Sequence, residues 1–247
     1  MHIGIIPDGN RRFAHKNNIN KKEAYKIGYD LILNMIHEVI KHRHKIMKII
    51  DEKYGNIELN FNVKELTIYV CSLDNLTNRD KEDTENIYRL IKKFLKYYEV
   101  NKDFIMKHKI KIVIIGDLNK IDTLLKENLN KIMLDTYDNT HFTLNLAIAY
   151  SGKWEINNMV KEIVDIKSLL SNKNINDDII RDHMKLKNDI DIVIRTGFEK
   201  RMSDFFPYQT VYSEWFFIDK YWPELTFEDL LSIIKEYQFE RKRRFGY

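Results

Sequence analysis

Two short basic segments hold the residues in this chain that could do chemistry. Residues 8–12 read Asp-Gly-Asn-Arg-Arg and follow an apolar run. Residues 195–203 contain two arginines, Arg195 and Arg201, and the hydroxyl of Ser203. Arginine forks match the oxygens of phosphate groups and remain charged at any relevant pH. Both segments therefore predict binding of a phosphate or diphosphate group.

Asp8 also predicts that a metal ion binds at this site. Its carboxylate would repel a phosphate directly, but it can hold Mg²⁺, which in turn binds phosphate oxygens. Pro7 ends the strand expected before it, and Asp8-Gly9 is a turn dipeptide, so Asn10 can cap the helix that follows. Helix N-termini attract anions through their free N–H groups. An ordinary strand–turn–helix with solvated arginines explains this segment equally well when it is taken alone.

Apolar strands alternate with amphipathic helices along the chain, which predicts an α/β fold with a largely parallel central sheet flanked by helices. Strands are expected at residues 2–6, 65–71, 110–115, 142–149, 191–194 and 215–218. Helices are expected at residues 23–47, 81–106, 118–133, 154–170, 177–184 and from 226 toward 244. Residues 41–62 are charged and show no clear register, so they are expected to be a solvated extension or a membrane-facing patch.

Polar clusters follow four of the expected strands. Because the carboxyl ends of parallel strands share one edge of a sheet, these clusters should meet there. They are residues 8–12, 72–79, 151–153 and 195–203. This convergence is the main argument from the residues themselves for a functional site.

Glu214 lies in a partly apolar run, where an unpaired carboxylate would be costly. Two interpretations stay open for it at this point. It could help to hold Mg²⁺, or it could form a structural ion pair with Arg195 or Arg201.

Composition narrows the class of protein. The 247 residues are 44% hydrophobic and contain only 3 Pro and 8 Gly, so a single domain over residues 1–247 is expected. A net charge of +4 suits anionic ligands or an anionic membrane surface, and we expect no nucleic-acid partner. The single cysteine, Cys71, excludes an internal disulfide and a multi-cysteine zinc site. We expect a cytoplasmic protein without a signal peptide or spanning helix, with peripheral membrane contact open.

The sequence resembles the cis-prenyltransferases, the family of undecaprenyl and dehydrodolichyl diphosphate synthases. Residues 2–14 are similar to the first signature of that family, and its later motifs appear in the same order. They are Ser72 with Asp74-Asn75, residues 145–154, 191–203, Glu214, Trp222-Pro223 and residues 243–246. Phe198 departs from the family pattern, because a Gly is usual at that position.

The resemblance implies roles for individual residues. Asp8 would be the Mg²⁺-linked catalytic carboxylate, Asn75 would lie near the reacting atoms, and Glu214 would help with the metal. The residues implied on the allylic diphosphate side are Gly9, Asn10, Arg11, Arg12, Lys21 and Tyr25. Those implied to bind isopentenyl diphosphate, or to help with diphosphate binding, are Ser72, Arg79, Arg195, Arg201 and Ser203.

The implied activity is condensation of isopentenyl diphosphate with an allylic diphosphate such as farnesyl diphosphate, giving a cis-polyprenyl diphosphate, with Mg²⁺ as cofactor. The growing chain needs an apolar cleft between helices and sheet, walled by residues 81–106, 65–71 and 142–149. The C-terminal motif is similar to a tail that reaches across a homodimer in some members. The alternative is a non-catalytic scaffold subunit. An unrelated nucleotide-binding protein is disfavoured, because both glycine-rich phosphate loops are missing.

Overall fold

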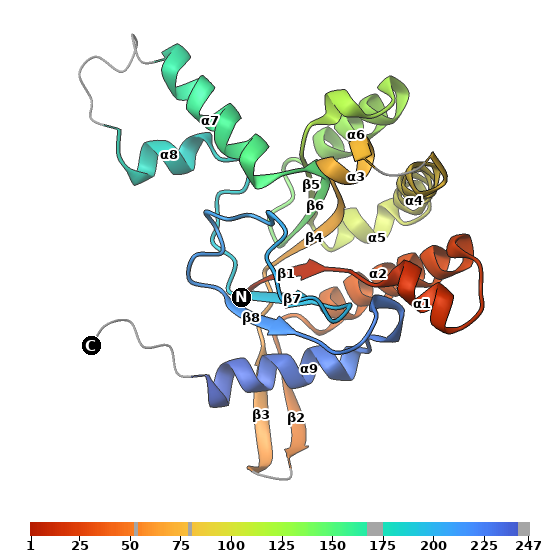
Figure 1. Cartoon of the computed structure of the whole chain (residues 1–247). Helices are drawn as coiled ribbons and strands as arrows, with labels where there is room; N and C mark the ends of the chain where they lie inside the picture. Colours follow the sequence, from red (N-terminus) through yellow and green to blue (C-terminus); the bar gives the residue numbers. More distant parts are fainter. Residues whose placement is uncertain (52–53, 79–80, 167–174, 242–247) are drawn as a thin grey trace.

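The computed structural model describes residues 1–51, 54–78, 81–166 and 175–241 (Figure 1). Within these ranges six parallel strands form one sheet in the order β5-β6-β4-β1-β7-β8. The strands are β1 (His2–Ile6), β4 (Glu65–Ser72), β5 (Ile110–Ile115), β6 (Phe142–Tyr150), β7 (Ile192–Arg195) and β8 (Glu214–Phe217). Each lies within one residue of its predicted bounds, and the parallel sheet is confirmed.

The first strand lies in the middle of the sheet, although it begins the chain. Ile3 is in register with Leu66 of β4 on one side and with Ile192 of β7 on the other. All five residues of β1 are buried, because helices or long loops cover both faces of the sheet. The segment that follows β1 therefore opens at the centre of the sheet edge.

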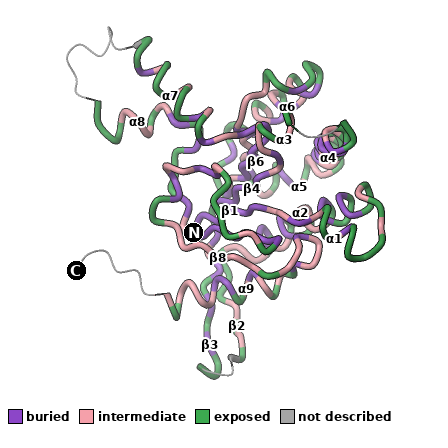
Figure 2. The backbone as a smooth tube through the Cα atoms, viewed as in Figure 1, coloured by how far each residue is buried: buried purple, intermediate pink, exposed green. Residues whose placement is uncertain are grey.

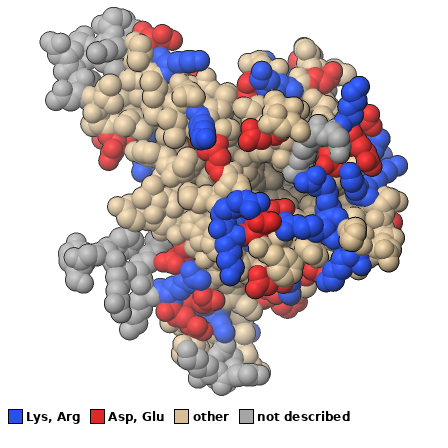
Figure 3. Space-filling model, viewed as in Figure 1, with Lys and Arg blue, Asp and Glu red and all other residues tan. Residues whose placement is uncertain are grey.

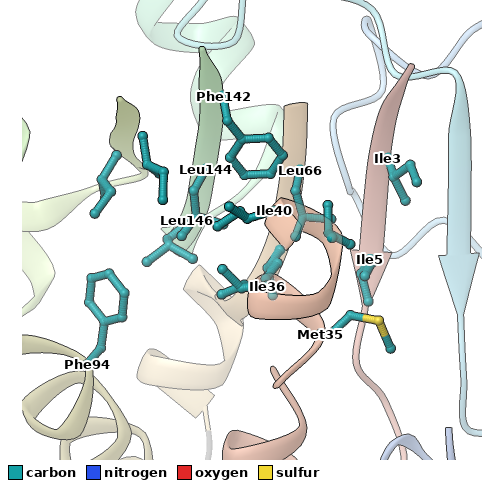
Figure 4. Packing of buried hydrophobic residues seen from close by; sticks show 14 of the residues in the cluster. Ile3, Ile5, Met35, Ile36, Ile40, Leu66, Phe94, Phe142, Leu144 and Leu146 are labelled. Carbon is teal, nitrogen blue, oxygen red and sulfur yellow. The ribbon is translucent and has the colours of Figure 1, made fainter. Parts of the chain in front are cut away.

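Helices cover the sheet mainly on one face. The helices are α1 (Asn10–Lys16), α2 (Lys21–His42), α3 (Leu73–Asn78), α4 (Lys81–Val100), α5 (Lys102–Lys107), α6 (Thr123–Asp135), α7 (Gly152–Ile166), α8 (Asp177–His183) and α9 (Phe227–Lys235). The largest core cluster joins Ile3, Ile5 and Leu66 of the sheet to Ile36 of α2 and Phe94 of α4 (Figure 4).

The other face carries a smaller core. Tyr69 and Val193 of the sheet pack there against Phe205 and Phe206 from the long connection between β7 and β8. Burial is concentrated in the central strands (Figure 2), and α7 with α8 stands away from them as an arm (Figure 1). Within the described residues, every helix is too short or too polar to cross a bilayer.

Residues 41–62 have a regular register that the sequence did not predict, whereas a solvated extension or a membrane-facing patch stays a prediction for them. They contain a second, two-stranded antiparallel sheet formed by β2 (Lys45–Asp51) and β3 (Gly55–Phe61). Leu59 and Phe61 face the core, and Phe61 packs against Phe227 of α9 at 5.7 Å between ring centroids. The preceding helix ends at His42 instead of residue 47, because His44 adopts a left-handed φ of 66° that cannot continue it.

Other boundaries also differ from the prediction. The supposed polar loop 72–79 contains α3, whose first turn is capped by Ser72 Oγ accepting from the Asn75 N–H at 3.1 Å. The expected helix over 81–106 is two helices separated at Asn101. Asn10 does not cap α1: Gly9 is its N-cap, in a left-handed conformation with φ 107°. Two 3₁₀ turns, η1 (Leu118–Lys120) and η2 (Trp222–Glu224), and the π-turn η3 (Glu236–Glu240) complete the described elements.

Candidate active site

A tight turn after β1 places Asp8 at the edge of the sheet. Its backbone is held by Thr196, whose hydroxyl accepts from the Asp8 N–H at 3.0 Å and donates to the Asp8 carbonyl at 2.8 Å. The Trp222 N–H donates to the same carbonyl at 3.0 Å. Gly9 is required next, because a Cβ there would lie 2.7 Å from the Tyr221 ring. The turn is therefore fixed by two distant segments of the chain.

The Asp8 carboxylate lies between two arginines. Arg195 donates from Nη2 to Asp8 Oδ2 at 2.9 Å, and Arg12 donates from Nη2 to Asp8 Oδ1 at 3.3 Å. Arg195 is only 3% exposed, and its Nη1 also donates to Ser203 Oγ at 2.6 Å. The structure thus brings together four residues that the sequence analysis placed in one site.

Glu199 extends this arrangement, and the sequence analysis gave it no role. Its Oε1 accepts from Arg12 at 2.9 Å, and its Oε2 accepts from Arg201 at 2.5 Å. Five side chains then alternate in sign, and we call them the charge row: Arg201, Glu199, Arg12, Asp8 and Arg195. The signal for Glu199 was its position between the two arginines of residues 195–203. The row has one excess positive charge, which suits an anionic ligand.

Arg11 is held by a carboxylate that sequence reasoning also missed. Asp83, in the first turn of α4, is fully buried and accepts from Arg11 Nη1 at 3.1 Å. Lys21 Nζ lies 3.7 Å from the other Asp83 oxygen and 3.4 Å from Glu82. Nothing in the local sequence indicates that Asp83 is buried, because an acidic residue in a first helical turn is usually solvated.

These polar groups line one end of a cavity of about 850 Å³. The space-filling view shows Lys and Arg side chains beside a hollow on this face (Figure 3). The lining at the polar end includes Asp8, Gly9, Asn10, Arg11, Arg12, Tyr25, Ser72, Asn75, Ser151, Arg195, Glu199, Arg201 and Ser203. The predicted meeting of four strand-end clusters is therefore observed.

The other end of the cavity is apolar. The predicted walls are present, with Ile87, Leu90, Ile91 and Phe94 of α4, Val70 and Cys71 of β4, and Leu146 and Ile148 of β6. A further wall comes from α2, which supplies Tyr29, Ile32, Leu33 and Ile36. Burial raises the pKa of the Tyr29 and Tyr69 hydroxyls, so both rings stay neutral. The cavity therefore joins a charged end to an uncharged hydrocarbon lining.

Some predicted site residues lie elsewhere. Glu214 begins β8 outside the cavity lining, and it forms an ion pair with Arg241 at 3.0 Å instead of with Arg195 or Arg201. Lys21 lies beside the cavity without lining it. Arg79 and residues 243–246 fall outside the described residues. Among the described residues no group of three or more acidic, His or Cys side chains forms a metal cage.

Fold and site together define an α/β protein with an anion site at the carboxyl edge of a parallel sheet, opening into an apolar cavity. Such a site suits a ligand with a phosphate head and a hydrocarbon tail. The sequence model of the family described as "Putative undecaprenyl diphosphate synthase" matches residues 6–246. The chain therefore belongs to the cis-prenyltransferase family.

Relatives agree with this assignment over nearly the whole chain. A tritrans,polycis-undecaprenyl-diphosphate synthase (geranylgeranyl-diphosphate specific) of Sulfurisphaera tokodaii is 33% identical, covering 100% of this chain and 87% of the relative. A ditrans,polycis-undecaprenyl-diphosphate synthase ((2E,6E)-farnesyl-diphosphate specific) of Buchnera aphidicola is 34% identical over 99% of this chain and 90% of its own. The crystal structure of lavandulyl diphosphate synthase from Lavandula x intermedia shares the fold, with a TM-score of 0.84 at 24% identity, covering 100% and 98% of the two chains.

Proposed function

We propose that this protein condenses isopentenyl diphosphate with an allylic diphosphate, such as farnesyl diphosphate, to form a cis-polyprenyl diphosphate. The observation that carries the proposal is the contact of Asp8 with Arg195 in a cavity whose other end is apolar. The charged end suits two diphosphate groups, and the apolar end suits a growing isoprenoid chain. Substrates held side by side react faster because their approach and orientation are fixed in advance.

The arginines divide between two substrates in this proposal. Arg11, Arg12 and the N–H groups that begin α1 bind the allylic diphosphate, as the resemblance of residues 2–14 to the first family signature implies. Arg195, Arg201 and Ser203 bind isopentenyl diphosphate from the neighbouring strand. Negative charge develops on the leaving diphosphate as the new carbon–carbon bond forms, and fixed guanidinium groups stabilise that charge. Asn75, from the start of α3, lies at the cavity and helps to orient the reacting ends.

Mg²⁺ is the proposed cofactor, and the residues present fit a metal that arrives with its substrate. Mg²⁺ is often held by one or two carboxylates, with phosphate oxygens and water as its other ligands. Asp8 provides such a carboxylate, one third exposed at the cavity and flanked by arginines that can donate hydrogen bonds to phosphate oxygens. When bound there, Mg²⁺ neutralises diphosphate charge. Glu214 is not a ligand in this proposal, because its carboxylate pairs with Arg241.

The scaffold alternative is not favoured. A subunit that only supports a catalytic partner has no need of Asp8 and its two arginines, and here all three are present and in contact. The relatives described above are named as synthases.

Incubation with radiolabelled isopentenyl diphosphate, farnesyl diphosphate and Mg²⁺ tests the proposed activity. We expect extractable prenyl products longer than the primer, and about 100-fold less product or lower still when Asp8 is replaced by Asn. Geranylgeranyl diphosphate should be compared as primer in the same assay. A wild-type protein that forms no product with either primer would count against the proposal.

A homodimer is the proposed assembly. Ile156, Val160 and Val164 recur every four residues on α7 and are exposed, while Met159 and Ile163 on the adjoining face are buried. Such a stripe on a projecting arm suits contact with a second copy. We expect Val160→Glu to produce monomers in sedimentation velocity runs, while Lys161→Glu, beside it but off the stripe, should not. Equal dimer content in both variants would contradict this interface.

Peripheral membrane contact and a cytoplasmic location stay predictions. Ile46 and Ile50 are exposed on β2 with Lys45 and Lys48 between and beside them, a pattern that suits an anionic lipid surface. Flotation with anionic and neutral vesicles would test this, because only anionic vesicles should bring the protein to the top of the gradient.

A further inference from the structure

An aromatic pair outside the cavity joins the loop that carries Glu199 and Arg201 to the segment that packs against the turn carrying Asp8. The rings of Phe198 and Tyr221 meet edge to face, with 5.0 Å between their centroids. Phe198 follows β7 in the same loop as Glu199 and Arg201. Tyr221 comes immediately before η2, and neither residue is among those that line the cavity.

Phe198 has an unfavourable backbone for its residue type. Its φ is 62°, in the left-handed region where a bulky side chain is disfavoured. Phe198 is 49% exposed, so burial in the core does not account for an aromatic residue here. A glycine would adopt this φ without strain. The contact that the ring makes is with Tyr221, and that contact is the reason we assign to the aromatic side chain.

Tyr221 supports the other loop. A Cβ on Gly9 would meet its ring at 2.7 Å, so the turn that carries Asp8 lies directly against it. The Arg12 guanidinium lies 6.0 Å from the Tyr221 ring centroid, and the Lys16 ammonium lies 5.5 Å from it. A cation near an aromatic ring is attracted by the ring's electron density. The ring therefore provides the surface beside which Arg12 is placed between Asp8 and Glu199.

We propose that Phe198 is a positioning residue: by fixing the Tyr221 ring, it fixes the Arg12 guanidinium for binding the allylic diphosphate. The inference rests on the proposed function for its substrate, and it adds a role for a residue that touches neither substrate nor cavity. It also links the loop that binds one diphosphate to the loop that binds the other.

Phe198→Gly is the decisive variant, because it removes the ring and also relieves the backbone strain. We expect the KM for farnesyl diphosphate to rise about three- to tenfold, the factor that corresponds to losing one aromatic contact, with kcat within about twofold. Its Tm should stay level or rise. A ring that served stability alone would instead lower Tm and leave KM unchanged. Phe198→Tyr keeps an aromatic ring at this position and should therefore have the wild-type KM.

Lys109→Gly is the matched control. Lys109 is also exposed and also left-handed, with φ 48°, but it precedes β5 at the opposite end of the sheet. The same relief of strain there should leave KM unchanged. Combining Phe198→Gly with Arg12→Gln should give an effect smaller than the product of the two single effects, because both act on one guanidinium.

Calorimetry with inorganic pyrophosphate and Mg²⁺ separates this inference from the proposed function. If the wild-type protein forms no prenyl product, the proposed function fails, and pyrophosphate affinity still reports on Arg12. Pyrophosphate binding that weakens by a similar factor in Phe198→Gly supports the inference. Equal pyrophosphate affinity in Phe198→Gly and wild type would overturn it.

Discussion

Arg195 donates a hydrogen bond to the Asp8 carboxylate at 2.9 Å, although 187 positions separate the two residues. The guanidinium is 3% exposed and the carboxylate 33% exposed, so the cation is buried and its partner faces the cavity. Adjacent parallel strands produce this contact, because Ile6 at the end of β1 is in register with Arg195 at the end of β7. The same contact determines what replacing either residue should do.

Two replacements of Asp8 should distinguish its role in catalysis from its role in stability. Asp8→Asn keeps an oxygen that accepts from Arg195 but loses the charge, so we expect kcat to fall about 100-fold or more with little change in Tm. Asp8→Ala also leaves Arg195 without its carboxylate. Fully buried pairs cost about 3–5 kcal/mol to break, and the partial exposure of Asp8 reduces the expected loss to about 1–2 kcal/mol.

Turnover assays and thermal melts of the two Asp8 variants check this prediction. Ser151→Ala is a suitable control, since Ser151 lines the same cavity but bonds to Asp204 at 2.6 Å instead of to the charge row. Substantial turnover by Asp8→Asn would remove Asp8 from the catalytic role.

Arg12 and Arg201 should affect different substrates, although Glu199 bridges them. Arg12→Gln should raise the KM for the allylic diphosphate about tenfold, because one charged hydrogen bond to the ligand is lost. Arg201→Gln should raise the KM for isopentenyl diphosphate by a similar factor. Steady-state kinetics with each substrate varied in turn checks this. Identical effects of the two variants on both KM values would show that the two binding sites are not separated as we propose.

The apolar wall of α4 should limit product length. Ile91 lines the cavity and is 2% exposed, and Trp adds about as many atoms there as one five-carbon unit contains. We expect Ile91→Trp to shorten the longest product by at least one isoprene unit, as measured by chromatography of the dephosphorylated products. Leu95→Trp is the control, because Leu95 borders the groove between α4 and α6. A shift in the control alone would place the growing chain elsewhere.

Acid should weaken the hydrogen bond between Lys16 and Glu224, which lie next to Tyr221. A hydrogen bond from Lys16 at 2.8 Å holds the pKa of the Glu224 carboxyl below its ordinary value. A carboxyl with a lowered folded-state pKa stabilises the protein above its unfolded pKa of about 4.3, and this contribution disappears as pH falls through the folded value. Wild type should therefore melt higher than Lys16→Met at pH 7, and the gap should close as the pH falls below the unfolded pKa.

Thermal melts between pH 3 and 7 measure this effect. Lys26→Met, at an exposed position on α2, should follow the wild-type curve throughout. A gap between wild type and Lys16→Met that stays constant over the whole range would show that Glu224 does not titrate as expected.

The sequence pattern predicted the strands of the main sheet more accurately than the hairpin and the helix cap beside them. The strands of the main sheet are short and apolar, so each could be recognised without knowledge of its neighbours. The β2–β3 hairpin was missed because β2 shows no regular alternation of apolar and polar residues, and the alternation in β3 becomes a buried face only where the hairpin packs against α9. Asn10 is not the cap of α1 because the N-cap position needs a left-handed φ and has no room for a side chain beside the Tyr221 ring. Gly9 meets both requirements.

The sequence by itself determined which chemistry is available: Asp8 and the arginines follow parallel strands, and parallel strands end at one edge. Tertiary structure alone decided which charges face one another. Glu199 joins the charge row, Asp83 holds Arg11, and Glu214 pairs with Arg241 away from the cavity. The pattern of strands in the sequence predicts at which edge of the sheet a loop emerges. The direction of a side chain within that loop depends on contacts with segments far away in sequence.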